Sequence, residues 1–202
     1  MPTAVAQDTV FDGLLSLEVK SGPAVTGGKA SNGGVTMDVN RDGAHDLYVV
    51  NDGQPNQLFL GKKNGGFVEQ KSGPAVTGSK ASGGAVILDA NGDGWADLYV
   101  VNFDQPNQLY LNVYSKNGSF VEQKSGPAVS GNSYSQGAVA VDVSGDGWSD
   151  LYVVNRGQPN QLFINQGKKG GFVEQKSGPA VSGSTKSYGA VALDVNGDGA
   201  QE

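Results

Sequence analysis

Short apolar runs separated by polar turns dominate the chain and predict strands, because no segment keeps a helical period. One representative stretch contains four runs rich in β-branched and aromatic residues, each bounded by Gly, Asn, Asp or Pro: Gly84–Ala90, Asp97–Asn102, Gln108–Asn112 and Phe120–Lys124. Runs of this length and composition are typical of half-buried or buried strands. The pattern therefore predicts an all-β protein of short antiparallel strands.

The same order of runs recurs along the chain. The hexapeptide KSGPAV begins at Lys20, Lys71, Lys124 and Lys176, so the units are spaced 51, 53 and 52 residues apart. Four short strands in roughly 50 residues is the size of one β-propeller blade. We therefore expect a β-propeller of four-stranded antiparallel blades with about four repeats.

The repeats divide the chain into five parts. We expect degenerate third and fourth strands of a first or closing blade in residues 1–20, repeat one in 21–71, repeat two in 72–124, repeat three in 125–176, and a partial repeat four in 177–202 that supplies a first strand from Gly189 and an acidic loop. This array lacks one strand of a closed set of blades, and open sheet edges invite pairing. The protein is therefore expected to belong to a larger parent chain or to be completed as a homo-oligomer. The first residues also lack the basic and apolar regions of a signal peptide, so we expect an internal segment.

An acidic loop separates the first and second strands of every unit. Its second copy has the pattern D-x-N-x-D-G-x-x-D, with side-chain oxygens at positions one, three, five and nine and a backbone carbonyl at position seven. Hard oxygen ligands at this density suit Ca²⁺, and a glycine at position six permits the sharp turn. We expect about one Ca²⁺ per loop, held by Asp38, Asn40, Asp42, Ala44 and Asp46; by Asp89, Asn91, Asp93, Trp95 and Asp97; by Asp142, Ser144, Asp146, Trp148 and Asp150; and by Asp194, Asn196, Asp198, Ala200 and Glu202.

Two other interpretations of these loops are weaker. Asp, Asn and Gly also form ordinary turns, but a turn needs one or two such residues, and three crowded carboxylates repel one another without a cation. An EF-hand would need a glutamate at position twelve, where this chain has Val49, Val100 and Val153.

The charge of the chain is concentrated in these loops. The formal net charge is −6, and 12 of the 20 acidic residues lie in the four loops, which leaves eight acidic against 14 basic residues elsewhere. One divalent ion per loop would bring the net charge to +2. The acidity therefore marks discrete sites, not an acidic surface for a basic partner.

The loop followed by DLYVVN, a polar turn, a QLF strand and a GxF hairpin resembles the FG-GAP/VCBS repeat family from about Leu17 to Glu202. This resemblance implies the calcium-binding propeller found in integrin α-subunits, some fungal lectins and many secreted microbial and algal proteins. It places the calcium loops between strands one and two of each blade.

Catalysis finds little support in the sequence. His45 is the single histidine, cysteine is absent, and no nucleotide-binding fingerprint occurs. The basic residues are too sparse for nucleic-acid binding, and no apolar run is long enough to insert into a membrane. We therefore expect a protein that is not an enzyme, and the resemblance to the FG-GAP/VCBS family implies a place outside the cell or at its surface.

The segments between blades are the best candidates for ligand contact. They carry Lys29, Lys80, Lys186, Tyr134 and Tyr188 among small hydroxyl residues. The leading hypothesis is an adhesion, assembly or ligand-recognition module with a protein or glycan ligand. The alternatives are a lectin with sugar sites between blades and an accessory domain of a larger secreted enzyme.

Overall fold

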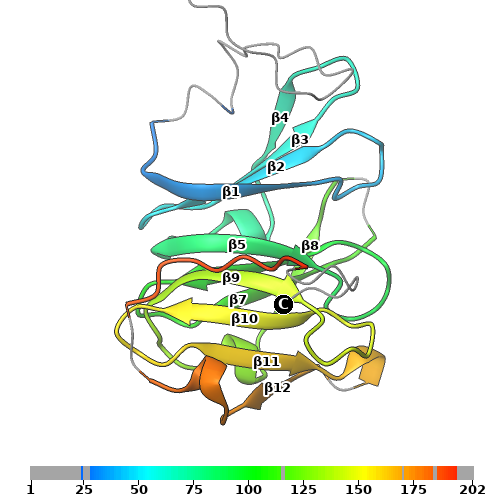
Figure 1. The fold of residues 1–202 in the computed structure, drawn as a ribbon. Helices are drawn as coiled ribbons and strands as arrows, with labels where there is room; N and C mark the ends of the chain where they lie inside the picture. The colour runs from blue at the N-terminus through cyan, green and yellow to red at the C-terminus, as the bar shows by residue number, and fades with distance from the viewer. Residues whose placement is uncertain (1–23, 25–27, 115–116, 170, 184–185, 195–202) are drawn as a thin grey trace, which may run out of the picture.

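The computed structural model of the protein describes residues 24, 28–114, 117–169, 171–183 and 186–194. Within them, twelve strands form three four-stranded antiparallel sheets (Figure 1). The strands are β1 (Ser31–Met37), β2 (Asp46–Asn51), β3 (Gln57–Gly61) and β4 (Phe67–Gln70); β5 (Ser82–Leu88), β6 (Asp97–Asn102), β7 (Gln108–Asn112) and β8 (Phe120–Gln123); and β9 (Ser135–Val141), β10 (Asp150–Asn155), β11 (Gln161–Asn165) and β12 (Phe172–Gln175). Each sheet keeps its strands in chain order. The predicted all-β fold of four-stranded antiparallel blades is confirmed.

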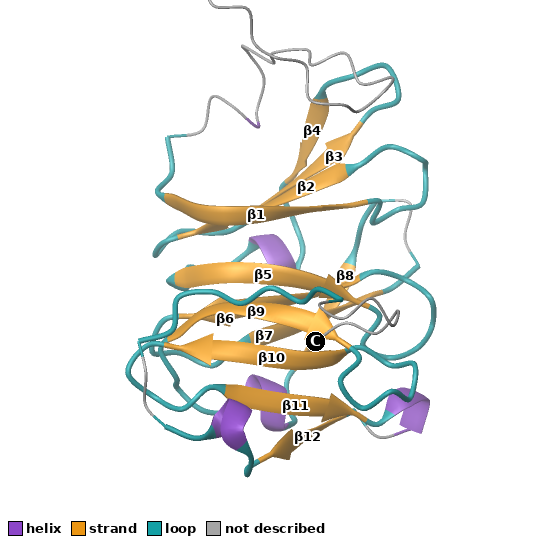
Figure 2. Ribbon diagram, viewed as in Figure 1, coloured by secondary structure: helices purple, strands orange, loops and turns teal. Residues whose placement is uncertain are grey.

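The helical elements in the part of the chain that is described are four short 3₁₀ turns, which lie in the connections outside the strands (Figure 2). Three of them are the PAV segments, η1 (Pro74–Val76), η2 (Pro127–Val129) and η4 (Pro179–Val181), and η3 is Gly167–Lys169. Proline suits the first position of such a turn because its φ is already restricted and its missing N–H is not needed there.

The predicted strand boundaries of the second unit are nearly those observed. The second and third strands match, whereas β5 runs over Ser82–Leu88 instead of Gly84–Ala90, and β8 ends at Gln123. The first strand starts earlier because the hydroxyl of Ser82 is buried and donates to the Oδ1 of Asn102 at 2.9 Å, which anchors its end to β6.

The first strand expected in the fourth unit is wrong. Residues 186–194 carry one isolated bridge, between Lys186 and Arg156, and no strand. In the three complete blades the equivalent segment pairs with the strand that follows the acidic loop, and the described residues 186–194 make no such pairing. The segment instead lies against β9, where a Cβ added to Gly137 would lie 3.6 Å from the backbone oxygen of Tyr188.

The proposed repeat boundaries stay a prediction, and the strands expected in residues 1–20 lie outside the described residues.

Two apolar layers hold the three sheets together. The middle sheet contributes to both, because Leu98 and Val100 of β6 face one neighbour while Tyr99 and Val101 face the other. All six residues of β6 are buried, which explains why LYVV is a continuous apolar run and not an alternating one. In β2, by contrast, burial alternates over its first residues.

Tyrosine hydroxyls connect each blade to the turn that starts the next unit. The hydroxyls of Tyr48, Tyr99 and Tyr152 donate to the carbonyl oxygens of Ala75, Ala128 and Ala180 at 2.7, 2.6 and 2.7 Å. This geometry accounts for the repeated tyrosine of DLYVVN and for the repeated PAV turn.

A second polar connection runs from blade to blade through asparagine and serine. Asn107 accepts from the backbone N–H of Asn102 and donates its Nδ2 hydrogens to the hydroxyl oxygen of Ser135 at 3.1 Å. Ser135 in turn donates to Asn155 Oδ1 at 2.9 Å. The same relay joins the other units through Asn56 to Ser82 and through Asn160 to Ser187.

Small residues let the first strands of successive blades approach closely. β1 lies beside β5 and β5 beside β9 (Figure 1). A Cβ at Gly83 would come within 2.5 Å of the Phe103 ring and 2.9 Å of the Ser135 carbonyl oxygen, so no larger residue fits there without movement.

The Tyr99 hydroxyl provides a test of this stacking. In the Tyr99→Phe variant the Ala128 carbonyl loses its donor, and the Asn107 amide loses an acceptor at 3.1 Å. Unpaired buried polar groups cost about 1–3 kcal/mol, so urea denaturation should show a loss of that size. Tyr188→Phe is the control, since Tyr188 is 61% exposed and its change should stay within about 0.5 kcal/mol. Equal losses in both variants would contradict the proposed role.

Candidate metal sites

The first aspartate of each acidic loop folds the turn around itself. Asp89 Oδ1 accepts from the backbone N–H groups of Gly92 and Asp93 at 2.8 and 3.1 Å, and its Oδ2 accepts from Gly94 at 2.8 Å. Asp142 accepts the equivalent three bonds, and those bonds, led by that from Gly147, lower the pKa of its carboxyl group. The glycine expected at position six has a positive φ in all three described loops, 85° at Gly43, 84° at Gly94 and 89° at Gly147.

Positions three and five lie next to that aspartate. The backbone N–H of Asp93 donates both to Asp89 Oδ1 and to Asn91 Oδ1, so these two oxygens are close together. The Asn91 amide also donates to Asp93 Oδ2 at 2.8 Å. The loop beginning at Asp38 repeats this arrangement through Asn40 and Asp42.

The ninth position links the loop to two strands, a role that the sequence analysis missed. Asp97 is fully buried; its Oδ2 accepts from the N–H of Ala90 at 3.0 Å and its Oδ1 from the N–H of Asn112, on β7, at 2.7 Å. Asp46 and Asp150 make the same pair of bonds in their blades. A buried aspartate at the first residue of an apolar strand is the signal that points to this role.

Burial makes the charge of this carboxylate expensive. Desolvation raises the pKa of Asp97 to about 6, against the lowering effect of the N–H groups of Asn112 and Ala90, and the charges of Asp93 and Asp89 raise it further. The pKa of Asp46 and that of Asp150 are raised in the same direction, first by burial. Each loop therefore gathers negative charge that its own hydrogen bonds do not fully offset.

The loops fit calcium by the chemistry of their donors. Each described loop offers carboxylate, amide or hydroxyl, and carbonyl oxygens, which hard divalent cations prefer. In their present positions, no three acidic or histidine side chains among the described residues converge closely enough to hold one ion. The fit of the loops to calcium therefore rests on the kinds of oxygen donor they offer and on the short distances between positions one, three and five.

Most of the predicted calcium ligands of the fourth loop lie outside the described residues. Asp194 is exposed, whereas Asn196, Asp198, Ala200 and Glu202 lie beyond the described residues.

The family assignment follows the loops. FG-GAP-like repeats match at residues 38–100, 89–153 and 142–202, and each match begins at the first aspartate of one acidic loop. The chain belongs to the FG-GAP-like repeat family. The resemblance drawn from the loop and strand motifs is thereby confirmed.

Curated relatives of this FG-GAP-like chain are similar over most of its length. It is 27% identical to Cartilage acidic protein 1 of Mus musculus over 164 residues, which is 77% of this chain and 25% of the relative. It is 25% identical to Cartilage acidic protein 1 of Homo sapiens over 182 residues, or 86% of this chain and 27% of that protein. The chain thus spans about a quarter of the length of these relatives.

The position-seven tryptophans of the FG-GAP-like loops contact the loop of the preceding blade. The Arg41 guanidinium lies 4.2 Å from the centroid of the Trp95 ring and donates to the Gly94 carbonyl. Trp148 packs on Gly92 so closely that a Cβ there would come within 2.1 Å of the ring. The acidic loops of successive blades therefore form one connected row.

The segments between blades hold the other predicted binding residues. Lys29 and Lys80 donate to proline carbonyls. Tyr134 stacks on Phe103 with centroids 4.8 Å apart, and Arg156 lies 5.7 Å from the Tyr134 ring centroid and 5.8 Å from that of Tyr188. Phe103 and Arg156 were not among the binding residues predicted from the sequence. Both directly follow the second strand at a position where the first unit has Asp52, and this variation within the repeat is the signal.

In the described part of the chain, no helix is long and apolar enough to cross a membrane.

The buried aspartate of position nine supplies a test that does not depend on an ion. Asp97→Asn keeps the shape of the side chain but replaces an acceptor by a donor, so one of the two buried N–H groups loses its partner. In EDTA, denaturation should show a loss of about 2 kcal/mol. The exposed Asp104→Asn is the matched control and should be nearly neutral. An unchanged stability of Asp97→Asn would refute the bracing role.

Proposed function

We propose that this chain is a calcium-binding, non-catalytic propeller module of an extracellular protein, and that it presents the segments between its blades to a protein or glycan partner. The observation that carries the proposal is a set of oxygen donors at the same spacing in three successive described loops of an FG-GAP-like array, with a hydroxyl in place of an amide at position three of the third loop.

Electrostatics supports calcium in these loops. Asp89, Asp93 and Asp97 lie within nine residues, and the charges of the first two raise the pKa of the third. A divalent cation would offset that repulsion. Larger numbers of flexible oxygen ligands suit Ca²⁺, whereas Mg²⁺ demands a tight octahedron and keeps several waters.

The ion would act as a structural staple between the first two strands of a blade. Extracellular modules bind Ca²⁺ at roughly 10⁻⁴–10⁻³ M. At about 1 mM free Ca²⁺, a site with a Kd of about 10⁻⁴ M adds roughly 1.4 kcal/mol to stability. Three or four such sites would contribute several kcal/mol, a large part of the stability of an ordinary domain.

An extracellular location and the lack of catalytic activity are parts of the same proposal. The relatives are named for cartilage, which supports a place outside the cell or at its surface. His45 is exposed, and the buried carboxylates at position nine are occupied by backbone N–H groups, as the braces of a scaffold would be. Completion by a homo-oligomer or by a larger parent chain belongs to this proposal as well.

Calcium should stabilise the protein through the loops. Adding about 1 mM Ca²⁺ to EDTA-treated protein should raise the Tm by roughly 10 °C, whereas Mg²⁺ should have a much smaller effect. The triple variant Asp42→Asn, Asp93→Asn, Asp146→Asn should lose most of this rise. Asparagine still offers the Oδ1 that each position-five residue uses to accept from the N–H of position seven.

The control for that experiment removes charge elsewhere. Asp52 and Asp104 are exposed residues that follow the second strands, and the double change to asparagine should keep the full calcium response. A Tm that does not depend on calcium in the unmodified protein would contradict the calcium assignment.

Glycan recognition is the second candidate, favoured by the contacts around Arg156. Tyr188 is 61% exposed beside the guanidinium, and an aromatic face next to hydrogen-bond donors can hold a sugar ring. If the protein is a lectin, a glycan array should show binding that Tyr188→Ala and Arg156→Ala each weaken by tenfold or more, while Tyr114→Ala, an equally exposed tyrosine, leaves it intact. An array without saturable binding would exclude this candidate.

A further inference from the structure

One position in the repeat changes its chemistry between blades. Two residues before the serine that begins each first strand, the chain has Lys29, Lys80 and Ser133 in units one, two and three. The Lys29 ammonium donates to the Pro55 carbonyl oxygen at 2.7 Å, and the Lys80 ammonium donates to the Pro106 carbonyl oxygen at 2.9 Å. Each lysine therefore folds over the proline turn of its own blade.

The backbone follows the same path in blades two and three. The Lys80 carbonyl accepts from the N–H of Gly53 at 3.2 Å, and the Ser133 carbonyl accepts from the N–H of Asp104, the equivalent residue one blade later, at the same 3.2 Å. The exchange of lysine for serine therefore shortens a side chain without displacing the chain that carries it.

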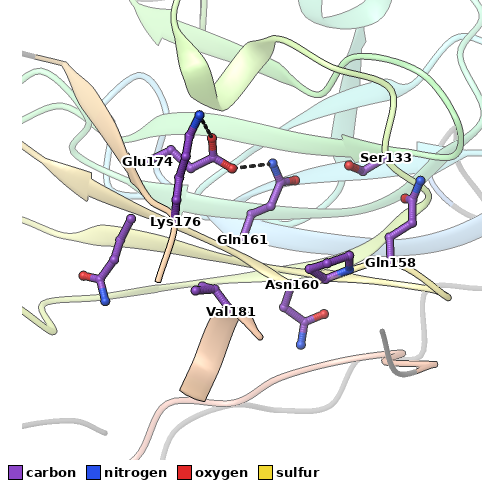
Figure 3. Close-up of a pocket in the computed structure, with 9 residues that line it drawn as sticks. Ser133, Gln158, Asn160, Gln161, Glu174, Lys176 and Val181 are labelled. Carbon is purple, nitrogen blue, oxygen red and sulfur yellow. Dashed lines mark hydrogen bonds and ion pairs between the residues drawn. The ribbon is translucent and has the colours of Figure 1, made fainter. Parts of the chain in front are cut away.

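A pocket lies where the lysine is missing. Its volume is about 370 Å³, within the usual range for ligand sites. It is lined by Ser133, by the proline turn and by the end of β12 (Figure 3). The lining side chains that matter below are those of Ser133, Gln161, Glu174 and Lys176, together with Pro159 and Val181.

The carbonyl of the proline turn has capacity for a second donor. Pro55 and Pro106 each accept two bonds, one from their lysine and one from the amide of Asn51 or Asn102, at 2.7 and 2.8 Å respectively. Pro159 accepts from the Asn155 amide at 2.8 Å. A carbonyl oxygen carries two lone pairs, so a further donor in the pocket can be accommodated as in the sister blades.

The carboxylate of the pocket is suited to a cation. Glu174 Oε1 accepts from Gln161 at 3.1 Å, and its Oε2 lies 3.8 Å from the Lys176 ammonium (Figure 3). In blade two the equivalent Glu122 accepts from Gln108 at 3.0 Å and pairs with Lys124, while the Lys80 ammonium donates to the Pro106 carbonyl oxygen. Burial lowers the pKa of Lys80, and the charge of Glu122 opposes that shift. Blade two thus holds one ammonium on the carboxylate and a second on the proline carbonyl, so Lys176 does not exclude a second ammonium from the pocket of blade three.

We propose that this pocket receives the ammonium group of a lysine side chain from a partner protein, in the place that Lys80 occupies in blade two. The identification of the partner as a protein rests on the proposed function, while the chemistry of the pocket does not. Lys29 and Lys80 are built-in examples of the ligand: an alkyl chain that ends in an ammonium hydrogen-bonded to a proline carbonyl. Among the described residues that line the pocket there is no aromatic side chain on which a sugar ring would stack.

The test is a titration of the calcium-loaded protein with Nα-acetyl-lysine methylamide, followed by NMR. Shifts should saturate with one site and a Kd in the roughly millimolar range, at resonances of Ser133, Gln161 and Glu174. Nα-acetyl-norleucine methylamide, which keeps the alkyl chain without the charge, should bind at least tenfold more weakly. Glu174→Gln should also weaken binding tenfold or more.

Two reciprocal variants make the result decisive. Ser133→Lys should fold, because units one and two carry lysine there, and it should abolish binding by filling the pocket with its own ammonium. Lys80→Ser should open a second pocket and raise the stoichiometry from one to two. Unchanged binding by Ser133→Lys, equal binding of the norleucine compound, or saturable binding of sugars only would overturn the proposal. A protein whose Tm does not respond to calcium can still be titrated, because the pocket and the acidic loop lie at different ends of β9: Ser133 precedes this strand and the acidic loop follows it. Failure of the calcium assignment and failure of the lysine pocket can therefore be distinguished.

Discussion

Burial of the second strand of each blade against a neighbouring sheet, and of β6 between two, is the constraint on which the rest of the structure depends. In β6 every residue is buried, including the polar residues at its two ends, Asp97 and Asn102. Such groups must be paired or they cost more than the apolar contacts return. Asp97 satisfies N–H groups of its loop and of β7, and Asn102 contacts Ser82 and Asn107. The acidic loop at one end and the asparagine–serine relay at the other are therefore both consequences of stacking blades.

The same constraint separates what repeats from what varies. Residues that satisfy buried partners, such as the tyrosine bonded to each PAV turn, recur in every described blade. Positions that satisfy no buried partner differ between the units. Lysine in units one and two is replaced by Ser133 in unit three, and Asp52 after the second strand is replaced by Phe103 and Arg156. Candidate ligand contacts are concentrated at these departures from repetition. The scaffold and the recognition surface can accordingly be assigned to different residues of the same unit.

The sequence predicted the sheets well because strand length, turn residues and a fixed repeat all agree. DLYVVN and QLYLN became strands as expected, and the acidic loop took the turn that its glycine requires. An aspartate at the start of an apolar strand hints at the bracing role of Asp97, but its partner Asn112 could not be identified, since it lies 15 residues away and only strand pairing brings the two together. The pocket at Ser133 was hidden for a similar reason: a serine in a polar segment is unremarkable until the structure shows where Lys80 lies. The first strand expected from Gly189 failed because periodicity predicts a strand without supplying its partner.

The acidic loops are proposed to hold calcium and thereby to make the scaffold rigid. Terbium luminescence tests it most directly, because the only two tryptophans, Trp95 and Trp148, occupy position seven of two loops. Excitation of tryptophan should produce sensitised Tb³⁺ emission that Ca²⁺ abolishes by competition and Mg²⁺ leaves nearly unchanged. Absence of sensitised emission, or emission that Ca²⁺ does not displace, would contradict the account.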